Sequence, residues 1–362
     1  MGASQNILSK PSLIGLNIAE LQKQLEPFGE PKFRADQIYR WIHQQNADSF
    51  ANMSNLSKEL RTGLAEKFSL KTMKMAAHEI SSDGTEKFLW QLADGRRVES
   101  VLIPDGKRTT ICISSQVGCS LGCRFCATAQ MGYVRSLTAG EIVEQVLQIK
   151  KQTERRITNV VFMGMGEPFL NYRRVIRASE ILGDPDGIAI ANRRITISTA
   201  GITTRIRDFT EERQPFSLAI SLHAPTQGLR ASLMPIARKF PLDELISSAA
   251  FYLNLQKRRR ITFEYILLDG INDSPAEAKA LLRLLSPLRC KLNLIPCNET
   301  DLNFRAPSGE KMQRFLSILK TGPFAAMLRK NRGQDIAAAC GQLFVKTNSN
   351  GKKRFIRTAS PA

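Results

Sequence analysis

The sequence has no long apolar segment and no export signal. No apolar run reaches the roughly 18 residues that a membrane-spanning helix needs, which excludes a helical membrane protein. The opening residues, MGASQNILSK, lack the apolar stretch of a signal peptide, and Asn6 stands where an N-myristoylation motif requires Ser or Thr. We therefore expect a cytoplasmic protein with no membrane partner.

Acidic residues are scarce relative to basic ones. Asp and Glu total 33 against 52 Lys and Arg, which leaves a formal net charge of +19. An excess of this size implies a polyanionic partner, most simply nucleic acid or an acidic membrane surface. Basic runs recur along the chain, at residues 150–151, 155–156, 173–174, 193–194, 257–260 and 352–354. Their number predicts an extended surface that contacts phosphates.

Histidines are also few, and the cysteine count of seven is odd. An odd count in a chain without an export signal argues against a structural disulfide framework. Three of the cysteines, Cys119, Cys123 and Cys126, lie within eight residues with the spacing C-x3-C-x2-C. Clustered thiols in a reducing compartment indicate a metal site.

The spacing of these thiols favours an iron–sulfur cluster over zinc. A structural zinc site takes four ligands, and the chain has neither a second C-x2-C pair nor a pair of neighbouring histidines. Three thiolates suit a four-iron cluster in which one iron stays open for another ligand. The alternative is an iron–sulfur or zinc protein that binds RNA without catalysis, with a distant cysteine as the fourth ligand.

After residue 107 the hydrophobic pattern alternates between strands and helices. It predicts strands at residues 108–114, 157–163, 194–198, 216–221, 261–267 and 291–295, and a further short strand at 325–329. Helices are predicted after the capping box at 138–141 and at residues 171–182, 242–255, 274–285 and 309–319. Six βα units with right-handed crossovers indicate an α/β fold, a partial (βα)6 barrel.

The first part of the chain has a different character. Residues 33–42 form a helical stretch that mixes basic and aromatic side chains, and residues 86–104 alternate as strands do. We predict an RNA-contacting N-terminal accessory domain at 1–98, helical at first and then stranded. A catalytic core follows at 99–345, and a basic, flexible tail at 346–362.

Polar and small residues follow the predicted strands at the same end of the sheet. In βα barrels the active site lies at the carboxyl ends of the strands. Taken singly, each such residue is more often a turn glycine, a cap or a satisfied histidine. Their shared position predicts one site that contains Gly166, Glu167, Ser198, Ser221, Leu222, His223 and Asn298.

Two further cysteines lie outside the cluster motif. Cys112 falls on the predicted inward face of the first barrel strand, seven residues before Cys119. Cys340 precedes Gly341, which indicates a turn rather than a helix interior. A lone cysteine is most often a small buried hydrophobe, so residue type alone assigns neither a function.

Four motifs together resemble one enzyme family. They are the three clustered cysteines, GMGEP at 164–168, SLH at 221–223 and ACGQL at 339–343. The set resembles the RlmN/Cfr family of radical S-adenosylmethionine (SAM) RNA methyltransferases over residues 30–345. The combination of QVGC at 116–119 with Cys112 and the late ACGQL is specific to this family. The chain is more similar to the branch that methylates adenine C2 than to the branch that methylates C8, which stays the alternative.

The resemblance implies two cofactors and their binding residues. A [4Fe–4S] cluster would be held by Cys119, Cys123 and Cys126, with SAM chelated to the open iron. The residues carried over as SAM contacts are Gly166, Glu167, Ser198, Ser221, Leu222, His223 and Asn298. Cys297, an additional thiol beside the last of these, has no role in this scheme.

The resemblance also implies catalytic roles and partners. Cys340 would carry the methyl group, Cys112 would form a disulfide with Cys340 to release the product, and Glu99 would accept the proton from the base. The implied substrates are an adenine of 23S ribosomal RNA and one of tRNA. An external electron donor such as flavodoxin is implied, and we expect a monomer.

Overall fold

A ten-stranded sheet organises the protein, whose computed structural model describes residues 10–298 and 302–343. Three antiparallel strands, β1 (Met73–Ile80), β2 (Glu86–Leu92) and β3 (Arg97–Asp105), form one end of this sheet. The rest is parallel and runs in the order β4 (Arg108–Cys112), β7 (Asn159–Phe162), β8 (Ile195–Thr199), β9 (Ser217–Ser221), β10 (Ile261–Leu267), β11 (Cys290–Pro296) and β12 (Ala325–Leu328).

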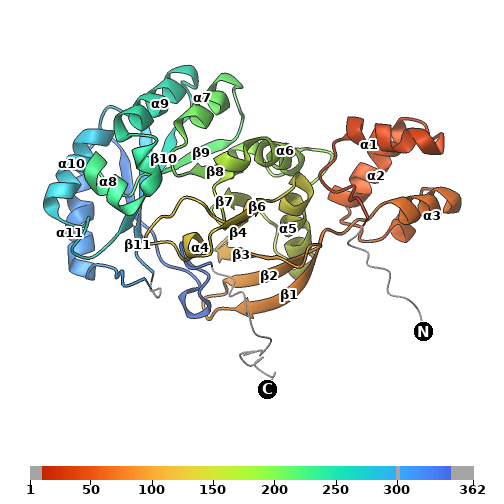
Figure 1. Cartoon of the computed structure of the whole chain (residues 1–362), viewed down its shortest axis with the longest axis horizontal. Helices are drawn as coiled ribbons and strands as arrows, with labels where there is room; N and C mark the ends of the chain where they lie inside the picture. Colours follow the sequence, from red (N-terminus) through yellow and green to blue (C-terminus); the bar gives the residue numbers. More distant parts are fainter. Residues whose placement is uncertain (1–9, 299–301, 344–362) are drawn as a thin grey trace.

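A helix follows each of the first six parallel strands and packs outside the sheet (Figure 1). These helices are α5 (Ala139–Gln152), α6 (Tyr172–Gly183), α7 (Thr203–Glu211), α9 (Leu242–Leu255), α10 (Pro275–Leu285) and α11 (Gly309–Leu319), with the short α8 (Gln227–Leu233) before α9. The predicted α/β partial barrel with six βα units is confirmed, and β12 adds a seventh parallel strand.

Strong local patterns give elements with the predicted bounds. The helices at 242–255 and 309–319 and the strand at 261–267 match the prediction to the residue. The sequence pattern did not reveal α7, because it is polar apart from two buried hydrophobic residues, Ile206 and Phe209. It also missed β1, of which only Met73 is buried. A strand or helix with so little burial leaves a weak periodic signal.

The N-terminal part is helical, with α1 (Ile18–Leu25), α2 (Phe33–His43) and α3 (Lys58–Lys67) set beside α5 and α6 (Figure 1). Tyr39 donates a hydrogen bond to Asp184 at 3.0 Å, so the helices are tied to the barrel. The strands β1–β3 extend the barrel sheet, and β3 spans the boundary expected at residue 98. The tail expected at 346–362 lies outside the described residues.

Candidate active site

The three clustered cysteines lie on a loop between β5 (Gln116–Gly118) and the short helix α4 (Ala127–Gln130), within the segment that connects β4 to α5. Cys119 and Cys123 are buried, and Cys126 is half-buried. Gly118 has φ +73°, and a Cβ there would lie 1.8 Å from the carbonyl oxygen of Gly132. Only glycine fits this position, and the close approach lets the Cys119 N–H donate to the same oxygen at 2.9 Å.

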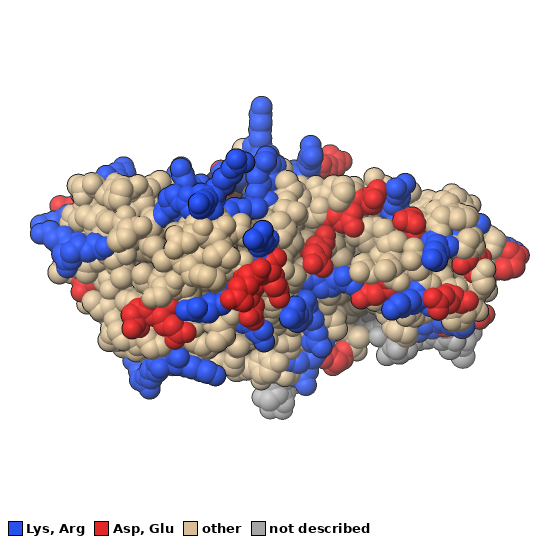
Figure 2. Space-filling view, turned by 90° about the horizontal axis from the view of Figure 1, so that it is seen from above, with Lys and Arg blue, Asp and Glu red and all other residues tan. Residues whose placement is uncertain are grey.

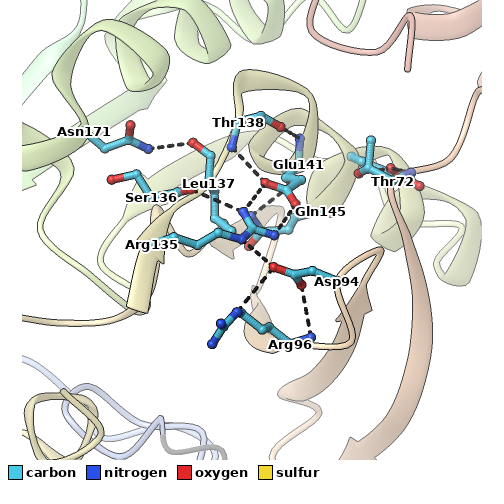
Figure 3. Close-up of polar contacts among 11 residues, drawn as sticks. Thr72, Asp94, Arg96, Arg135, Ser136, Leu137, Thr138, Glu141, Gln145 and Asn171 are labelled. Atoms are coloured by element: carbon cyan, nitrogen blue, oxygen red, sulfur yellow. Dashed lines mark hydrogen bonds and ion pairs between the residues drawn. The ribbon is translucent and has the colours of Figure 1, made fainter. Parts of the chain in front are cut away.

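A polar network holds the end of this segment that leads into α5 (Figure 3). Glu141 and Thr138 form the predicted capping box at the start of α5, and Arg135 binds the Glu141 carboxylate at 2.7 Å. Arg135 also binds Asp94 of the β2–β3 turn at 2.6 Å. Asn171 donates to the carbonyl of Leu137 at 2.8 Å. The end of the segment is therefore fixed to the β2–β3 turn, to the first turn of α5 and to Asn171 before α6.

Burial controls the protonation of the cluster thiols. Desolvation raises the pKa of Cys119 to about 12 and that of Cys123 well above its ordinary value. Mutual repulsion between the thiolates of Cys123 and Cys126 adds to this effect. Such thiols ionise only beside positive charge, which a metal centre supplies when it binds.

The arrangement of donors fits a cluster better than a single ion. Within residues 10–298 and 302–343, no three His, Cys, Asp or Glu side chains converge to hold one metal ion. A cubane binds each thiolate at a different iron, so its ligands need not share a point. Three thiols on one buried loop, beside a cavity that all three line, are the donor set such a cluster needs.

A cavity of about 160 Å³ opens beside the cluster loop at the carboxyl ends of the parallel strands. The structure brings most of the predicted site residues to its wall. They are Cys119, Cys123, Cys126, Gly166, Glu167, Ser198, Ser221, His223 and Cys340. Residues from five different segments thus meet in one place, as the barrel rule predicts.

Glu167 is held rigidly at this cavity. Its carboxylate accepts hydrogen bonds from the backbone N–H groups of Phe169 at 3.0 Å and Ala200 at 2.8 Å. Burial raises the pKa of Glu167 to about 7. Gly166 has φ +96°, and a Cβ there would lie 2.4 Å from the side chain of Gln116. The backbone can approach this closely only because residue 166 is glycine.

His223 follows β9 with φ +59°, a left-handed conformation that is uncommon for histidine. Its Nδ1 accepts a hydrogen bond from the Ile266 N–H at 2.9 Å, which leaves the proton on Nε2. Burial lowers the pKa of His223 to about 3, so the ring is neutral. Phe125 of the cluster loop packs edge-on against it, with ring centroids 4.8 Å apart. The neighbouring Leu222 is fully buried and does not line the cavity.

A second cavity of about 60 Å³ adjoins the first and contains the other cysteine pair. Cys112 and Cys340 both line it, and Cys340 lines the larger cavity as well. Cys340 lies in a turn, as predicted, and the Gly341 carbonyl accepts from the Ala127 N–H at 2.7 Å. Cys340 therefore borders both the cluster side and Cys112.

The two thiols of this pair differ in exposure. Cys112 is buried, and desolvation raises its pKa to about 12. Cys340 is exposed to solvent, although the surrounding protein still desolvates the thiol and raises its pKa. All seven cysteines are free thiols in this structure.

Asn298 and Glu99 do not line the larger cavity. The Asn298 amide donates to the Cys340 carbonyl at 3.0 Å and accepts from Gln334 at 3.1 Å, so it holds the Cys340 turn. Glu99 is buried on β3, with Lys87 Nζ 3.8 Å from its carboxylate, and lines neither of the two cavities. The SAM contact expected of Asn298 and the proton transfer expected of Glu99 remain predictions.

Sequence reasoning missed Glu264, in the middle of β10. It is 3% exposed and lines the larger cavity. One carboxylate oxygen accepts from Asn293 at 2.9 Å, whereas Oε2 has no hydrogen-bond partner among the described residues. Burial raises the pKa of Glu264 to about 7. The available signal was the one charged residue in a mostly apolar strand, ITFEYIL.

Arg230 of α8 was also missed, and no sequence pattern marked it. Its guanidinium is completely buried and donates to the carbonyls of Ala200 at 2.6 Å and of Ser221 and Leu222 at 3.3 Å. It thereby caps the carboxyl ends of β8 and β9. Burial lowers the pKa of Arg230 to about 10, and its positive charge lowers the pKa of Cys123.

Comparisons with known proteins agree with this architecture. The family model of the ribosomal RNA large subunit methyltransferase N-terminal domain matches residues 12–70, and that of the radical SAM superfamily matches residues 113–282. That superfamily works with a [4Fe–4S] cluster and SAM, which are therefore the cofactors of this enzyme. No helix in the described part of the chain is long and apolar enough to cross a membrane.

Full-length relatives cover nearly the whole chain. The dual-specificity RNA methyltransferase RlmN of Syntrophobacter fumaroxidans is 45% identical over 90% of this chain and 96% of its own. That of Geobacter sulfurreducens is 47% identical over 91% of both chains. The crystal structure of a radical SAM methyltransferase from Sphaerobacter thermophilus superposes with a TM-score of 0.89, at 44% identity over 92% of this chain and 99% of its own. On this evidence the chain belongs to the RlmN family of radical SAM methyltransferases.

Proposed function

We propose that this enzyme methylates C2 of adenine in RNA, at adenine 2503 of 23S ribosomal RNA and adenine 37 of tRNA. The observation that carries the proposal is the position of Cys340, whose thiol borders both the cavity beside the cluster loop and the cavity that contains Cys112. The printed name of the relatives, dual-specificity RNA methyltransferase, supports two RNA substrates.

Cofactor binding is assigned to residues of the larger cavity. Cys119, Cys123 and Cys126 would hold the cluster, and the strand-end residues would hold SAM. Glu167 suits the amino group of SAM, because a buried carboxylate stabilises an ammonium ion. Glu264 would accept a hydrogen bond from SAM, since its unpartnered Oε2 otherwise leaves a buried acceptor unsatisfied.

The cysteine pair divides the transfer into two steps. C2 of adenine is electron-poor and does not attack the methyl group of SAM directly. The Cys340 thiolate would therefore first take that methyl group as a thioether, with S-adenosylhomocysteine as the leaving group. The cluster, held by Cys119, Cys123 and Cys126 and reduced by an external donor such as flavodoxin, would supply the one-electron chemistry that, with a second SAM, removes a hydrogen atom from the S-methyl group of Cys340. After this carbon bonds to C2, the adduct would give its C2 proton to Glu99 and its unpaired electron back to the cluster. The Cys112 thiolate would then attack the Cys340 sulfur, so that a disulfide forms as the bond between that sulfur and the new methyl carbon breaks. That carbon would leave with the electron pair and take up a proton, which releases the methylated base.

The proposed reaction also needs an acceptor for the C2 proton and a route by which the adenine reaches Cys340. Glu99 is the candidate acceptor for the proton that leaves C2, and its burial on β3 beside Lys87 places a carboxylate in a protected position. Cys340 is exposed, so an unstacked adenine can reach it from solvent. The net charge of +19 suits an RNA partner, and Figure 2 shows Lys and Arg side chains spread over the face in view, with acidic groups between them.

An anaerobic assay tests the proposal directly. The purified enzyme is given methyl-deuterated SAM and unmodified 23S ribosomal RNA or tRNA, and nucleoside digests are analysed by mass spectrometry. We expect deuterated 2-methyladenosine from both RNAs. If only 8-methyladenosine is found, the enzyme methylates C8 rather than C2. If the protein contains zinc and no inorganic sulfide, the proposed radical mechanism is wrong.

A further inference from the structure

The loops that lead into the parallel strands carry a set of exposed arginines. Arg155 and Arg156 precede β7, Arg193 and Arg194 precede β8, and Arg258 and Arg260 precede β10. All six side chains are exposed. We call these six residues the basic rim, because they lie where the parallel strands begin.

The loops of the basic rim are neighbours in space. Strands β7 and β8 pair in parallel, with Val160 opposite Ile195, so the loops just before them lie side by side. The Ser217 hydroxyl donates to the Arg193 carbonyl at 2.9 Å, and the Arg259 guanidinium donates to the Pro215 carbonyl at 2.8 Å. The entries to β8, β9 and β10 are thus linked, and the segments that carry the six arginines follow one another along one edge of the sheet, in a row.

Acidic side chains do not neutralise this row. In the described residues, none of the six arginines forms an ion pair, whereas Arg173 pairs with Glu212 and Arg205 with Asp208 on nearby helices. Like charges held close together destabilise a folded protein through repulsion. The basic rim therefore has no explanation in the stability of the fold, and an external anion would relieve its repulsion.

The basic rim lies at the edge of the sheet opposite the reaction cavity. The cavity is lined by Ser198 and Ser221 at the carboxyl ends of β8 and β9, whereas the rim precedes the amino ends of the same sheet. Strand β10 alone has seven residues, which at about 3.3 Å per residue separates its ends by roughly 20 Å. A nucleotide whose base enters the cavity does not place its own phosphate on the rim.

We propose that the basic rim binds backbone phosphates of a second RNA segment, remote from the adenine that is methylated. The proposal rests on the proposed function, which makes RNA the polyanion present. Guanidinium groups suit phosphate because they donate paired hydrogen bonds to its oxygens. An anionic membrane fits less well, because membrane-surface helices also insert apolar side chains. Among the described residues, Leu255, at the end of α9, is the one large exposed hydrophobic residue in the segments that lead into β7, β8 and β10.

Two double variants of the holoenzyme test the proposal, Arg193→Gln/Arg194→Gln and Arg258→Gln/Arg260→Gln. Lys279→Gln/Arg314→Gln is the matched control, since it removes two exposed charges from the outer helices α10 and α11. Binding is measured at several salt concentrations, to a long 23S ribosomal RNA fragment and to a short hairpin that contains only the target loop. Methylation of the hairpin is measured in parallel.

We expect each rim variant to bind the long fragment roughly three- to tenfold more weakly, with a shallower salt dependence, because each lost phosphate contact reduces the number of counterions released. Hairpin binding, hairpin methylation and the control should be unchanged. Unchanged affinity for the long fragment would overturn the proposal, as would an equal loss for hairpin and fragment. Rim-dependent binding to phosphatidylserine vesicles without an effect on RNA would assign the rim to a membrane instead. Failure of the parent enzyme to methylate any RNA would contradict the proposed function, whereas the binding comparison would still decide the role of the rim.

Discussion

The two edges of one parallel sheet have opposite physical characters. At the carboxyl edge, Glu167, His223 and Glu264 are buried, and burial shifts the pKa of each. At the amino edge, the arginines of the basic rim are exposed and form no ion pairs in the described residues. Chemistry on a base needs desolvated groups in fixed positions, whereas attraction to phosphates needs only accessible charge.

This contrast explains why the same fold tolerates both features. Buried polar groups need partners, and the loops after the strands provide them, as when Asn272 donates to the His223 carbonyl at 2.9 Å. Exposed arginines keep their hydration and need no partner. Single substitutions at the carboxyl edge should therefore lower activity or stability. Substitutions at the amino edge should matter only where they remove positive charge. The following predictions test that division.

The largest effect is expected from loss of a cluster thiol. Cys123→Ala should remove the iron–sulfur cluster and reduce methylation below detection, because two thiolates hold a cubane poorly. Iron and acid-labile sulfide are measured in anaerobic preparations, together with visible absorbance. Cys290→Ala, a buried thiol at the amino end of β11, is the control that should keep its cluster. Full iron content in the Cys123 variant would show that the assignment of ligands is wrong.

Substitution of Cys340 and substitution of Cys112 should block methylation at two different steps. Cys340→Ala should abolish methylation, since no thiol is left to carry the methyl group. Cys112→Ala should instead stop after attachment to the base and leave a covalent protein–RNA adduct through Cys340. Denaturing gels detect this adduct as a slower band that RNase removes. Normal turnover by the Cys112 variant, with no such band, would contradict the assigned role.

A moderate effect on stability is expected at Glu264. Its pKa is about 7 in the folded protein and 4.5 as the ordinary value, so the folded state holds the proton more tightly. Stability is therefore lost as pH rises from about 4.5 to 7. Glu264→Gln should be more stable than the parent by up to about 3 kcal/mol at pH 8 and about equal to it at pH 4, since one pKa unit corresponds to about 1.4 kcal/mol.

Urea unfolding of cluster-free protein at both pH values measures this difference. Glu66→Gln, an exposed position on α3, is the control and should show the same pH dependence as the parent. Equal stability of parent and Glu264 variant at pH 8 would mean that the carboxylate has a partner in solution. The same variant should bind SAM more weakly, which equilibrium dialysis with the holoenzyme can measure.

The smallest effect is expected at the amino edge. Arg193→Gln/Arg194→Gln should change the free energy of unfolding by less than about 1 kcal/mol, since exposed substitutions without partners are close to neutral. Methylation of the short hairpin should stay within about twofold of the parent. A loss of hairpin methylation as large as that of a cluster variant would erase the proposed division between the two edges.

Local signals in the sequence predicted much of the fold. The capping box at Thr138, the alternating strands and the turn at Gly341 each depend on a few neighbouring residues, and each is present in the structure. The predictions were weakest for β1 and α7, where burial is too sparse to leave a periodic pattern. The family motifs found residues that the structure gathers at one cavity, although Leu222 and Asn298 do not line it.

The sequence alone determined the kinds of chemical group available: three thiols at a spacing suited to a cluster, a late cysteine in a turn, and an excess of positive charge. Those features depend on composition and short spacing, which are readable without a fold. Only the tertiary structure brought Cys112 beside Cys340, left one oxygen of Glu264 without a partner at the cavity, and placed the rim arginines on the opposite edge from the chemistry. These depend on which distant segments pack together, and that is decided by the pairing of strands and the burial of a shared core rather than by any local run of residues.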